Sequence, residues 1–458
     1  MDAAALLRDT AERAIAHLQG LADRPVHATA SVAELRDAFG GPLADGPLDP
    51  AVVVEELAEA AAPGTVGTMS PRYFGFVIGG SHPAAIAADW LVSAWDQNAG
   101  LHVGGPAVGV MEEVAGTWLL DLLGLPAHAS VGFVTGCQMA HFTALAAARH
   151  QVLAAVGWDV EADGLIGAPA LRAVVGTHRH VTVDRALRYL GLGTATIEVV
   201  ESDPAGRMDV DALRATLTSR PAGPTIVCTQ VGDVNTGAID PVADVIDVAH
   251  GHGAWVHVDG AFGLWAAASP SRRPLVEGLG GADSWATDAH KWLNVPYDSG
   301  LAFCAHPDAH RAAMATSASY LERVAGAPRE QMDWNPEFSR RARGVPVYAA
   351  LRSLGRRGVA DLVDRCCDLA ARFAERLAAE PGVTVLNDVV LNQVLVRFDD
   401  VGADEVVRRV QDDGTCWLSG TSWEGRPAMR ISVCNFQTTE DDVDRSIAAI
   451  LRAARSGP

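Results

Sequence analysis

The chain contains a single lysine, Lys291, within the sequence Thr-Asp-Ala-His-Lys-Trp. Lysine and arginine together number 36, so arginine supplies all the other positive charges of this kind. An arginine stays protonated in proteins, whereas a lysine can lose its proton and attack a carbonyl group. A lysine retained in such a chain therefore suits a Schiff base with a carbonyl cofactor. A surface lysine without function is the alternative, and the neighbouring residues must decide between the two.

A carboxylate supports the first interpretation. Asp259 directly follows the apolar run 255–258, and an acidic residue at the carboxyl end of a parallel strand points into the ligand crevice of an open α/β sheet. Such a carboxylate would keep the ring nitrogen of pyridoxal phosphate protonated, so that the ring can accept electrons when a bond at Cα breaks. A lone aspartate here is more often a turn or cap residue, but Asp259 followed by Lys291 favours cofactor binding.

Three further polar segments follow predicted strands at the same sheet edge. Residues 135–138 (Thr-Gly-Cys-Gln) join a strand to a helix, whose free N–H groups and positive dipole end suit a phosphate. His180 follows the strand 173–175 and could stack on a flat ring. Residues 232–237 form a polar loop after the strand 225–228. Each signal is weak alone, because glycine turns and structural histidines are common, but together with the lysine they indicate one crevice.

The elements that must position these residues follow an α/β pattern. From about residue 72 to residue 306, short apolar runs alternate with helical stretches, and most runs are continuously apolar. Continuous runs are typical of a mostly parallel sheet that is buried on both faces. The expected strands are 131–134, 173–175, 196–200, 225–228, 255–258 and 300–304.

The flanking regions differ from this pattern. Helices are expected at about 1–22 and 51–62, in a segment too small for its own core, which we expect to drape over another domain or a second subunit. Residues 307–336 resemble a loop and 347–379 a helix. The tail resembles an α+β domain, with strands at 383–386, 394–398 and 429–433 and helices at 402–412 and 439–455. We therefore expect an N-terminal helical segment at 1–70, a large α/β domain at 71–306, and a loop with a small α+β domain at 307–458.

Composition excludes several classes of function. The net charge of −20 and the pI near 5.1 argue against a nucleic-acid or anionic-membrane partner. The seven cysteines follow no metal-binding spacing, so we expect no metal site and a reduced, cytoplasmic location. The N-terminus lacks the features of a signal peptide. No apolar stretch reaches the ~20 residues that a membrane span needs.

From about residue 70 to residue 450 the sequence resembles the group II pyridoxal-phosphate-dependent decarboxylases. The most specific segments are His257-Val258-Asp259-Gly260-Ala261 and residues 282–293. The resemblance implies the α/β fold of fold-type I (aspartate aminotransferase-like) transferases, with a mostly parallel central sheet and a smaller α+β C-terminal domain. It also implies a homodimer with active sites at the interface. Supporting matches are residues 237–241, 339–343 and 350–355, and the segment with Pro106, Glu112 and Trp118.

The resemblance also implies roles for individual residues. Lys291 would form the Schiff base, Asp259 would pair with the ring nitrogen, and His180 would stack on the ring. The remaining cofactor contacts would come from Ala261 on the opposite ring face, from the phosphate turn of Gly136, Cys137 and Gln138, and from Thr287 and His290.

The chain departs from the family pattern at several places: Cys137 and Gln138 replace the usual small residues of the phosphate turn, Asp233-Val234 replace paired threonines, and two further departures bear on the chemistry. Asp288 stands where aromatic-type members often have asparagine, and an ionised carboxylate cannot donate to a phosphate, so Thr287 or Ser284 would take that role. Residues 323–337 contain no tyrosine or histidine. Aromatic-type members have a tyrosine in this mobile loop, which protonates Cα after CO2 leaves. Tyr320, just before the segment, is the nearest candidate.

We therefore predict a pyridoxal-phosphate-dependent carboxy-lyase that converts an L-amino acid, aromatic or apolar, to its amine and CO2. If Cα is protonated poorly, the alternatives are an aldehyde synthase, a transaminase or a carbon–carbon lyase. A non-catalytic protein of the same fold is a further alternative, against which the presence of both Lys291 and Asp259 argues. The sequence identifies neither the amino acid nor the pathway. Candidate substrate contacts are Phe76, Trp95 and His102, although aromatic residues are more often core, and Arg430 for a carboxylate.

Overall fold

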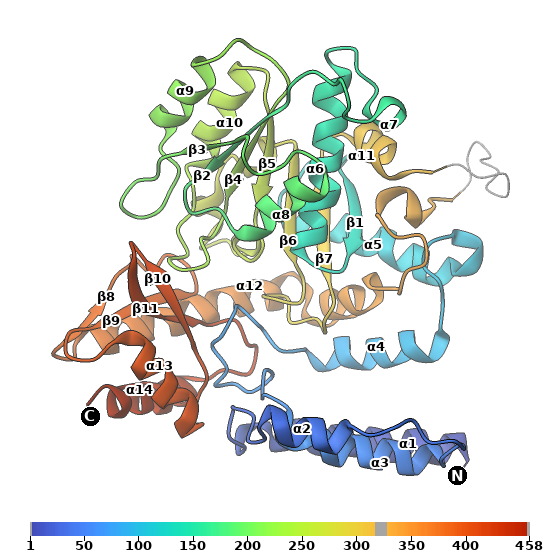
Figure 1. Ribbon diagram of the computed structural model, residues 1–458, viewed down its shortest axis with the longest axis vertical. Coiled ribbons are helices and arrows are strands. Elements are labelled where there is room, and N and C mark those ends of the chain that lie inside the picture. The colour runs from blue at the N-terminus through green and yellow to red at the C-terminus, as the bar shows by residue number, and fades with distance from the viewer. Residues whose placement is uncertain (1, 317–327, 456–458) are drawn as a thin grey trace.

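The centre of the molecule is a seven-stranded sheet in the order β1-β7-β6-β5-β4-β2-β3. The structure, a computed structural model, describes residues 2–316 and 328–455 (Figure 1). Strands β2 to β6 run parallel, whereas β7 is antiparallel to both of its neighbours, so β1 points the same way as the parallel strands. The expected mostly parallel sheet is confirmed. The strands are β1 Ser130–Val134, β2 Arg172–Gly176, β3 Ile197–Val200, β4 Thr225–Gln230, β5 Trp255–Asp259, β6 Ser284–Asp288 and β7 Gly300–Cys304.

This topology brings the carboxyl ends of six strands to one edge of the sheet. Helices cover both faces: α6 packs across β1 and β4 to β7, and α9 and α10 pack on the other side (Figure 1). Inward-facing valines such as Val227 and Val256 are fully buried, each worth about 1.5–3 kcal/mol relative to exposure. The helices of this region are α6 Cys137–Ala154, α7 Val160–Asp163, α8 Val181–Tyr189, α9 Val210–Thr218, α10 Val242–Gly251 and α11 Pro307–Met314.

The expectation of a loop throughout 307–336 is wrong at its start, because Pro307–Met314 forms helix α11. Pro307 occupies the first turn, where its missing N–H costs nothing, and Asp308 complements the helix dipole. The helix packs against α6. A short 3-10 turn, Gln331–Trp334, follows later in the same segment.

The C-terminal part contains a separate antiparallel sheet in the order β10-β11-β9-β8. Its strands are β8 Val383–Val385, β9 Gln393–Phe398, β10 Ser419–Trp423 and β11 Arg426–Ser432, of which β10 was not expected. Helix α13 (Ala403–Asp413) packs on this sheet, and α14 (Glu440–Arg455) packs on α13 and α12, so the expected α+β character is confirmed. The 35-residue helix α12, Gly344–Ala378, connects the two sheets and is interrupted at Gly355, where φ is 62°.

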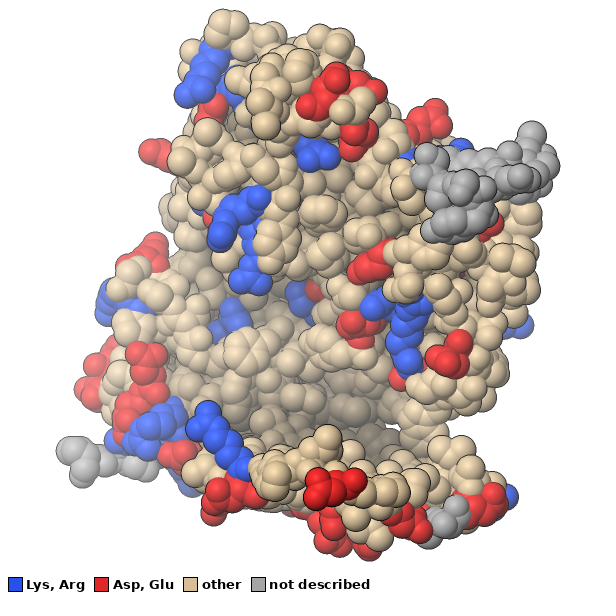
Figure 2. All heavy atoms as spheres, turned by 45° about the vertical axis from the view of Figure 1, so that its right-hand side comes forward, with Lys and Arg blue, Asp and Glu red and all other residues tan. Residues whose placement is uncertain are grey.

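The N-terminal helices have no core of their own. The described residues of α1, α2 and α3 include none that is buried, and large apolar side chains such as Leu7 and Leu57 are 69% and 57% exposed. Acidic side chains gather along the outer side of this segment, and the surface between it and the rest of the chain is hollowed (Figure 2). Among the described residues, no helix combines the length and the apolar character needed to cross a membrane. These helices are α1 Ala3–Gln19, α2 Val32–Phe39 and α3 Pro50–Ala61, followed by α4 Pro83–Trp95 and α5 Pro106–Leu122.

The three expected divisions at 1–70, 71–306 and 307–458 stay a prediction. Helix α2 was not expected, although Ser31 and Glu34 form a capping box that marks its start.

Candidate active site

Lys291 lies three residues beyond the end of β6, paired with the last residue of that strand. Its Nζ is 3.1 Å from Oδ2 of Asp288, and the two side chains are 18% and 4% exposed. Burial by itself lowers the pKa of Lys291, but the Asp288 carboxylate, with that of Asp259, outweighs it, so the pKa is raised. Lys291 is therefore an ammonium ion in the free protein, and its proton must leave before it can attack a carbonyl.

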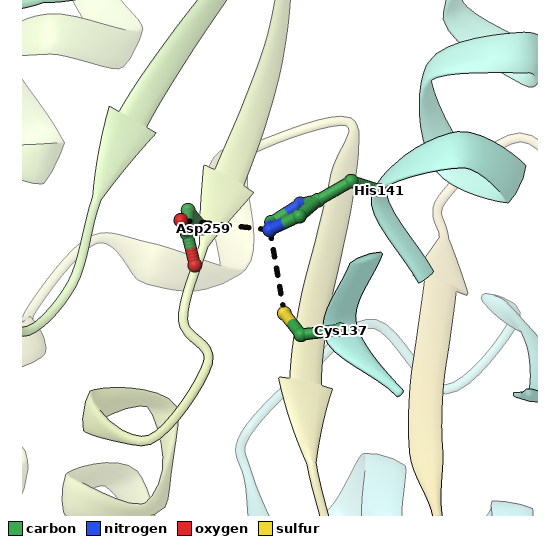
Figure 3. Close-up of side chains that lie close together, drawn as sticks. All are labelled: Cys137, His141 and Asp259. Carbon is green, nitrogen blue, oxygen red and sulfur yellow. Dashed lines mark hydrogen bonds and ion pairs between the residues drawn. The ribbon is translucent and has the colours of Figure 1, made fainter. Parts of the chain in front are cut away.

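Asp259 is the last residue of β5 and is 4% exposed. Its Oδ1 accepts the backbone N–H of Ala261 at 3.1 Å, and its Oδ2 lies 3.5 Å from Nε2 of His141 (Figure 3). Burial opposes ionisation, but the N–H of His141 and the ammonium group of Lys291 outweigh it and hold the pKa of Asp259 well below its usual range. The side chain is thus a carboxylate that can accept from a protonated ring nitrogen.

The N-terminus of α6 faces the same crevice. Gly136 is its N-cap, and the backbone N–H of Cys137 donates to Oδ1 of Asp288 at 2.6 Å. Among the described residues, both Nε2 and Oε1 of the Gln138 side chain are buried without a hydrogen-bond partner. Unpaired polar atoms beside a helix N-terminus and a buried lysine are what a phosphate-bearing aldehyde needs, so these residues fit pyridoxal phosphate.

His180 and Arg430 border the crevice from two different parts of the chain. His180 caps α8, and its Nδ1 is 2.7 Å from Oγ1 of Thr182. Burial chiefly lowers the pKa of His180, and Lys291 and Arg430 lower it further, so it is a neutral, flat ring. Arg430 lies on β11 and is 7% exposed; its Nη1 is 3.4 Å from Oδ1 of Asn235, and its Nε has no partner among the described residues. A poorly paired arginine in this position could bind a carboxylate.

His290 and Tyr297 form a stacked pair next to Lys291. Their ring centroids are 4.1 Å apart with an interplanar angle of 26°, and Nδ1 of His290 accepts the N–H of Ser299 at 3.2 Å. Tyr297 is 59% exposed, so part of its surface is free to contact a ligand. Sequence reasoning missed Tyr297, although an aromatic residue shortly after the lysine was the available signal.

The hydroxyl groups of Thr287 and Ser284, one of which was expected to bind a phosphate, both form hydrogen bonds within the protein. Thr287 Oγ1 donates to the carbonyl of Ala261 at 3.3 Å. Ser284 Oγ accepts from the indole of Trp255 at 2.9 Å and lies 2.9 Å from Nδ1 of His257. The expectation for Ser284 is therefore corrected: its hydroxyl is used inside the sheet, at the opposite end of β6 from Asp288.

The candidate substrate residues are placed less uniformly. Phe76 and Trp95 are 56% and 43% exposed, and Phe76 packs on Trp417 with centroids 5.3 Å apart. The segment that follows Phe76 reaches the site, because a Cβ on Gly79 would collide with the carbonyl of Lys291. The described contacts of Trp95 and His102 do not link them to Lys291 or Asp259. Tyr320 lies outside the described residues.

A buried ion pair braces the strand that leads into the phosphate turn. Glu112 on α5 and Arg340 are both fully buried, joined by two contacts of 2.9 Å each. Arg340 also donates to the carbonyls of Phe133 in β1 and Ala99, at 2.9 and 2.8 Å. The pair thus ties α5 to the end of β1, directly before Gly136.

A second buried group was missed by sequence reasoning. His141 lies one helical turn after Cys137 on α6, and ligand atoms of Cys137, His141 and Asp259 all lie within 4.8 Å of one another (Figure 3). The i, i+4 spacing on one helix was the only signal in the sequence.

Comparisons with known proteins show the family and the fold of the chain. The conserved-domain model for pyridoxal-dependent decarboxylases matches residues 42–399. The aromatic-L-amino-acid decarboxylase of Bacillus atrophaeus is 26% identical over 447 residues, 94% of this chain and 90% of that protein. The L-2,4-diaminobutyrate decarboxylase of Rhizobium meliloti is 29% identical over 81% of this chain and 75% of that protein. The phenylacetaldehyde synthase of Arabidopsis thaliana is 24% identical over 85% of this chain and 83% of that protein. The solved structure of Oryza sativa TDC with pyridoxal phosphate and tryptamine covers 99% of this chain and 97% of its own with a TM-score of 0.92 at 23% identity, a likeness that shows the fold.

Proposed function

The chain belongs to the pyridoxal-dependent decarboxylase family, and from this premise we propose that it converts an L-amino acid with an aromatic or apolar side chain to the amine and CO2. The enzyme is a lyase with pyridoxal phosphate as its cofactor. One observation carries the proposed site: Lys291, Asp259 and the N-terminus of α6 meet at one edge of the sheet.

When bound, pyridoxal phosphate supplies a ring that accepts the electron pair left at Cα as the carboxylate departs. Asp259 keeps a proton on the ring nitrogen, because its own pKa is held low and it can only accept. Gln138 and the N–H groups of α6 would bind the phosphate, and His180 would place its neutral ring against one face of the cofactor.

Asp288 controls the proton of Lys291. Its Oδ2 is 3.1 Å from Nζ, within reach of a direct transfer, and its Oδ1 already accepts from Cys137. We infer that Asp288 takes the proton when the amine attacks the cofactor aldehyde, and returns it when the product leaves.

The choice of bond depends on how the α-carboxylate is held. Among the described residues the Nε of Arg430 has no partner, and we propose that Arg430 would hold this carboxylate and so orient the bond that breaks. The exposed surfaces of Tyr297 and Phe76 offer aromatic contacts for a side chain. Relatives that carry the names of tyrosine and tryptophan decarboxylases support an aromatic substrate.

The test is mass spectrometry of products formed by the pyridoxal-phosphate-loaded protein from a pool of amino acids in air, with Lys291→Ala as the control. A product that is lighter than its parent by CO2 and is still an amine would support the proposal and identify the substrate. Turnover that survives Lys291→Ala, or the absence of any turnover of aromatic and apolar amino acids, would contradict it.

A second candidate is aldehyde formation. Two observations favour it: the segment 323–337 lacks a tyrosine, and relatives include 4-hydroxyphenylacetaldehyde synthase and phenylacetaldehyde synthase. This reaction consumes one O2 and one water per amino acid and gives the aldehyde, CO2, ammonia and hydrogen peroxide. Oxygen uptake that matches CO2 release would therefore distinguish it from simple decarboxylation, which uses no oxygen.

We also propose that the protein is a homodimer. The exposed apolar side chains of α1, α3 and α4, among them Leu7, Leu57 and Trp90, form a surface that water does not favour. Light scattering during gel filtration would test it: a mass near twice 48.0 kDa supports the proposal, and a monomer at micromolar concentration refutes it. A cytoplasmic location is a further proposal, supported by seven cysteines that are all free and buried.

A further inference from the structure

A chain of buried hydrogen bonds lies directly behind Asp259. Trp255, His257 and Asp259 occupy alternate positions of β5, so they share one face, which α6 covers. Oγ of Ser284 on β6 is 2.9 Å from both Trp255 Nε1 and His257 Nδ1. Nε2 of His257 is 2.9 Å from Nδ1 of His141, whose own Nε2 faces Asp259 at 3.5 Å (Figure 3).

The carboxylate end of this chain fixes its direction. An indole N–H can only donate and a carboxylate can only accept; a neutral histidine donates once and accepts once, and a serine hydroxyl donates once and can accept twice. With neutral rings, Ser284 therefore accepts from Trp255 and donates to Nδ1 of His257. The proton of His257 is then on Nε2 and points to Nδ1 of His141, so His141 carries its proton on Nε2, toward Asp259.

The reverse order is unfavourable. It would leave the Ser284 hydroxyl without an acceptor among its described contacts and aim a lone pair of His141 at the Asp259 carboxylate. Avoiding that repulsion by protonating His141 would place a second charge at a fully buried ring. Burial lowers the pKa of His257 to about 3, in agreement with a neutral ring at the centre of the chain.

We propose that His141 is a positioning residue, which donates its Nε2–H to Asp259 and so keeps that carboxylate ionised and aimed at the ring nitrogen of the cofactor. The proposal rests on the proposed role of Asp259. His141 does not touch the substrate; it acts through Asp259, and Ser284, His257 and Trp255 fix which of its nitrogens carries the proton.

Cys137 competes for the same N–H. Its Sγ is 3.4 Å from Nε2 of His141, but burial, with Asp288 and Asp259, raises the pKa of Cys137 well above its usual value, so it is a thiol and a weak acceptor. The same three side chains have the chemistry of a zinc site. Zinc would require an unprotonated Nε2 on His141, which is the opposite tautomer. The tautomer of His141 therefore distinguishes a zinc site from the proposed hydrogen bond to Asp259.

The first experiment uses the full-length protein without cofactor, labelled with ¹⁵N at histidine, with His141→Gln to assign the signals. We expect His141 and His257 to be neutral rings with the proton on Nε2. A proton on Nδ1 of His141, or zinc bound at one equivalent in the wild type and lost in His141→Leu, would overturn the proposal.

The second experiment measures the ring nitrogen of ¹⁵N-labelled pyridoxal phosphate in the holoenzyme. His141→Leu should move this signal toward the unprotonated position and weaken cofactor binding about 10- to 100-fold, the loss expected for a hydrogen bond to a charged group. His141→Gln, which keeps an N–H donor, should restore most of the ring-nitrogen signal and most of the cofactor affinity. The matched control is His310→Gln, which removes another buried histidine that is bonded to Ser130 and not to the site.

Equal ring-nitrogen signals in His141→Leu and His310→Gln would overturn the proposal even if both variants are less stable. Failure of the proposed function would look different. A wild-type protein with the expected tautomers and ring-nitrogen response, but without decarboxylation, would contradict the reaction and support the hydrogen-bond chain.

Discussion

The Glu112–Arg340 pair gives the sharpest prediction about stability. Both side chains are fully buried, and the two contacts of 2.9 Å make the pair bidentate. Removing one partner of a buried pair leaves an uncompensated charge, which costs about 3–5 kcal/mol. We therefore expect Glu112→Gln to destabilise the region by that amount. Arg340→Met should destabilise the region at least as much, because it also removes the hydrogen bonds to the carbonyls of Ala99 and Phe133.

The double variant is the critical one. Glu112→Gln with Arg340→Met leaves no buried charge, so its cost should be smaller than the sum of the single costs by roughly 2–3 kcal/mol. The assay is hydrogen exchange measured by mass spectrometry on peptides from α5 and β1, because local opening can be followed without assuming that the whole chain unfolds in one step.

The control is an exposed pair. Glu405 contacts Arg408 and Arg409 on the surface of α13, and Glu405→Gln should cost far less than Glu112→Gln, because an exposed ion pair contributes little. The reasoning is refuted if Glu112→Gln costs no more than Glu405→Gln, or if the two single costs simply add in the double variant.

Three further predictions concern the site and pH. Gly300→Ala should weaken pyridoxal phosphate binding at least about tenfold, because the added Cβ would collide with the backbone of Gly136 in the phosphate turn. Gly223→Ala is the control, because the space around Gly223 is open and binding should not change. Equilibrium dialysis measures cofactor binding by both variants. Asp288→Asn should lower the pKa of Lys291, because Asp288 is the group that raises this pKa most. The pH profile for recombination of the apoenzyme with the cofactor should therefore shift to lower pH. An unchanged profile would contradict this prediction. Burial lowers the pKa of His310 to about 3, so between pH 6.5 and 3 this imidazole is protonated in the unfolded chain but not in the folded one. The free energy of unfolding therefore falls as the pH falls through that window. His310→Gln should therefore reduce the slope of unfolding free energy against pH by up to about 1.4 kcal/mol per pH unit below pH 6, measured by denaturant titration at several pH values.

The sequence predicted the elements whose pattern is local. Mostly apolar runs such as 225–228 and 255–258 marked strands correctly because both faces of the sheet are covered. Strand β6 was not recognised as one, since its ends are the polar Ser284 and Asp288. Their partners, His257 and Lys291, make these polar ends compatible with burial, and such pairings are not visible in a local window.

The same distinction applies to the site. Lys291 and Asp259 were found because their residue types and positions after strands already indicate chemistry. His141 was missed because its partner His257 is 116 residues away, and only the packing of α6 on β5 brings the two together. The lack of a described hydrogen-bond partner for the Gln138 amide is likewise a property of the folded chain, which the motif alone does not show.

Gly355 has a consequence for the geometry between the two sheets. Before it, Tyr348 of α12 stacks on Trp118 of α5; after it, Arg372 pairs with Asp444 of α14. Its φ of 62° and ψ of 176° belong to a region that essentially only glycine occupies. At about 1.5 Å per residue, the roughly 23 residues beyond Gly355 form an arm of about 35 Å, so a rotation of about 10° there would displace its far end by roughly 6 Å. Because α12 packs on β8 and β9, the backbone angle at Gly355 contributes to the placement of the C-terminal sheet relative to the large sheet.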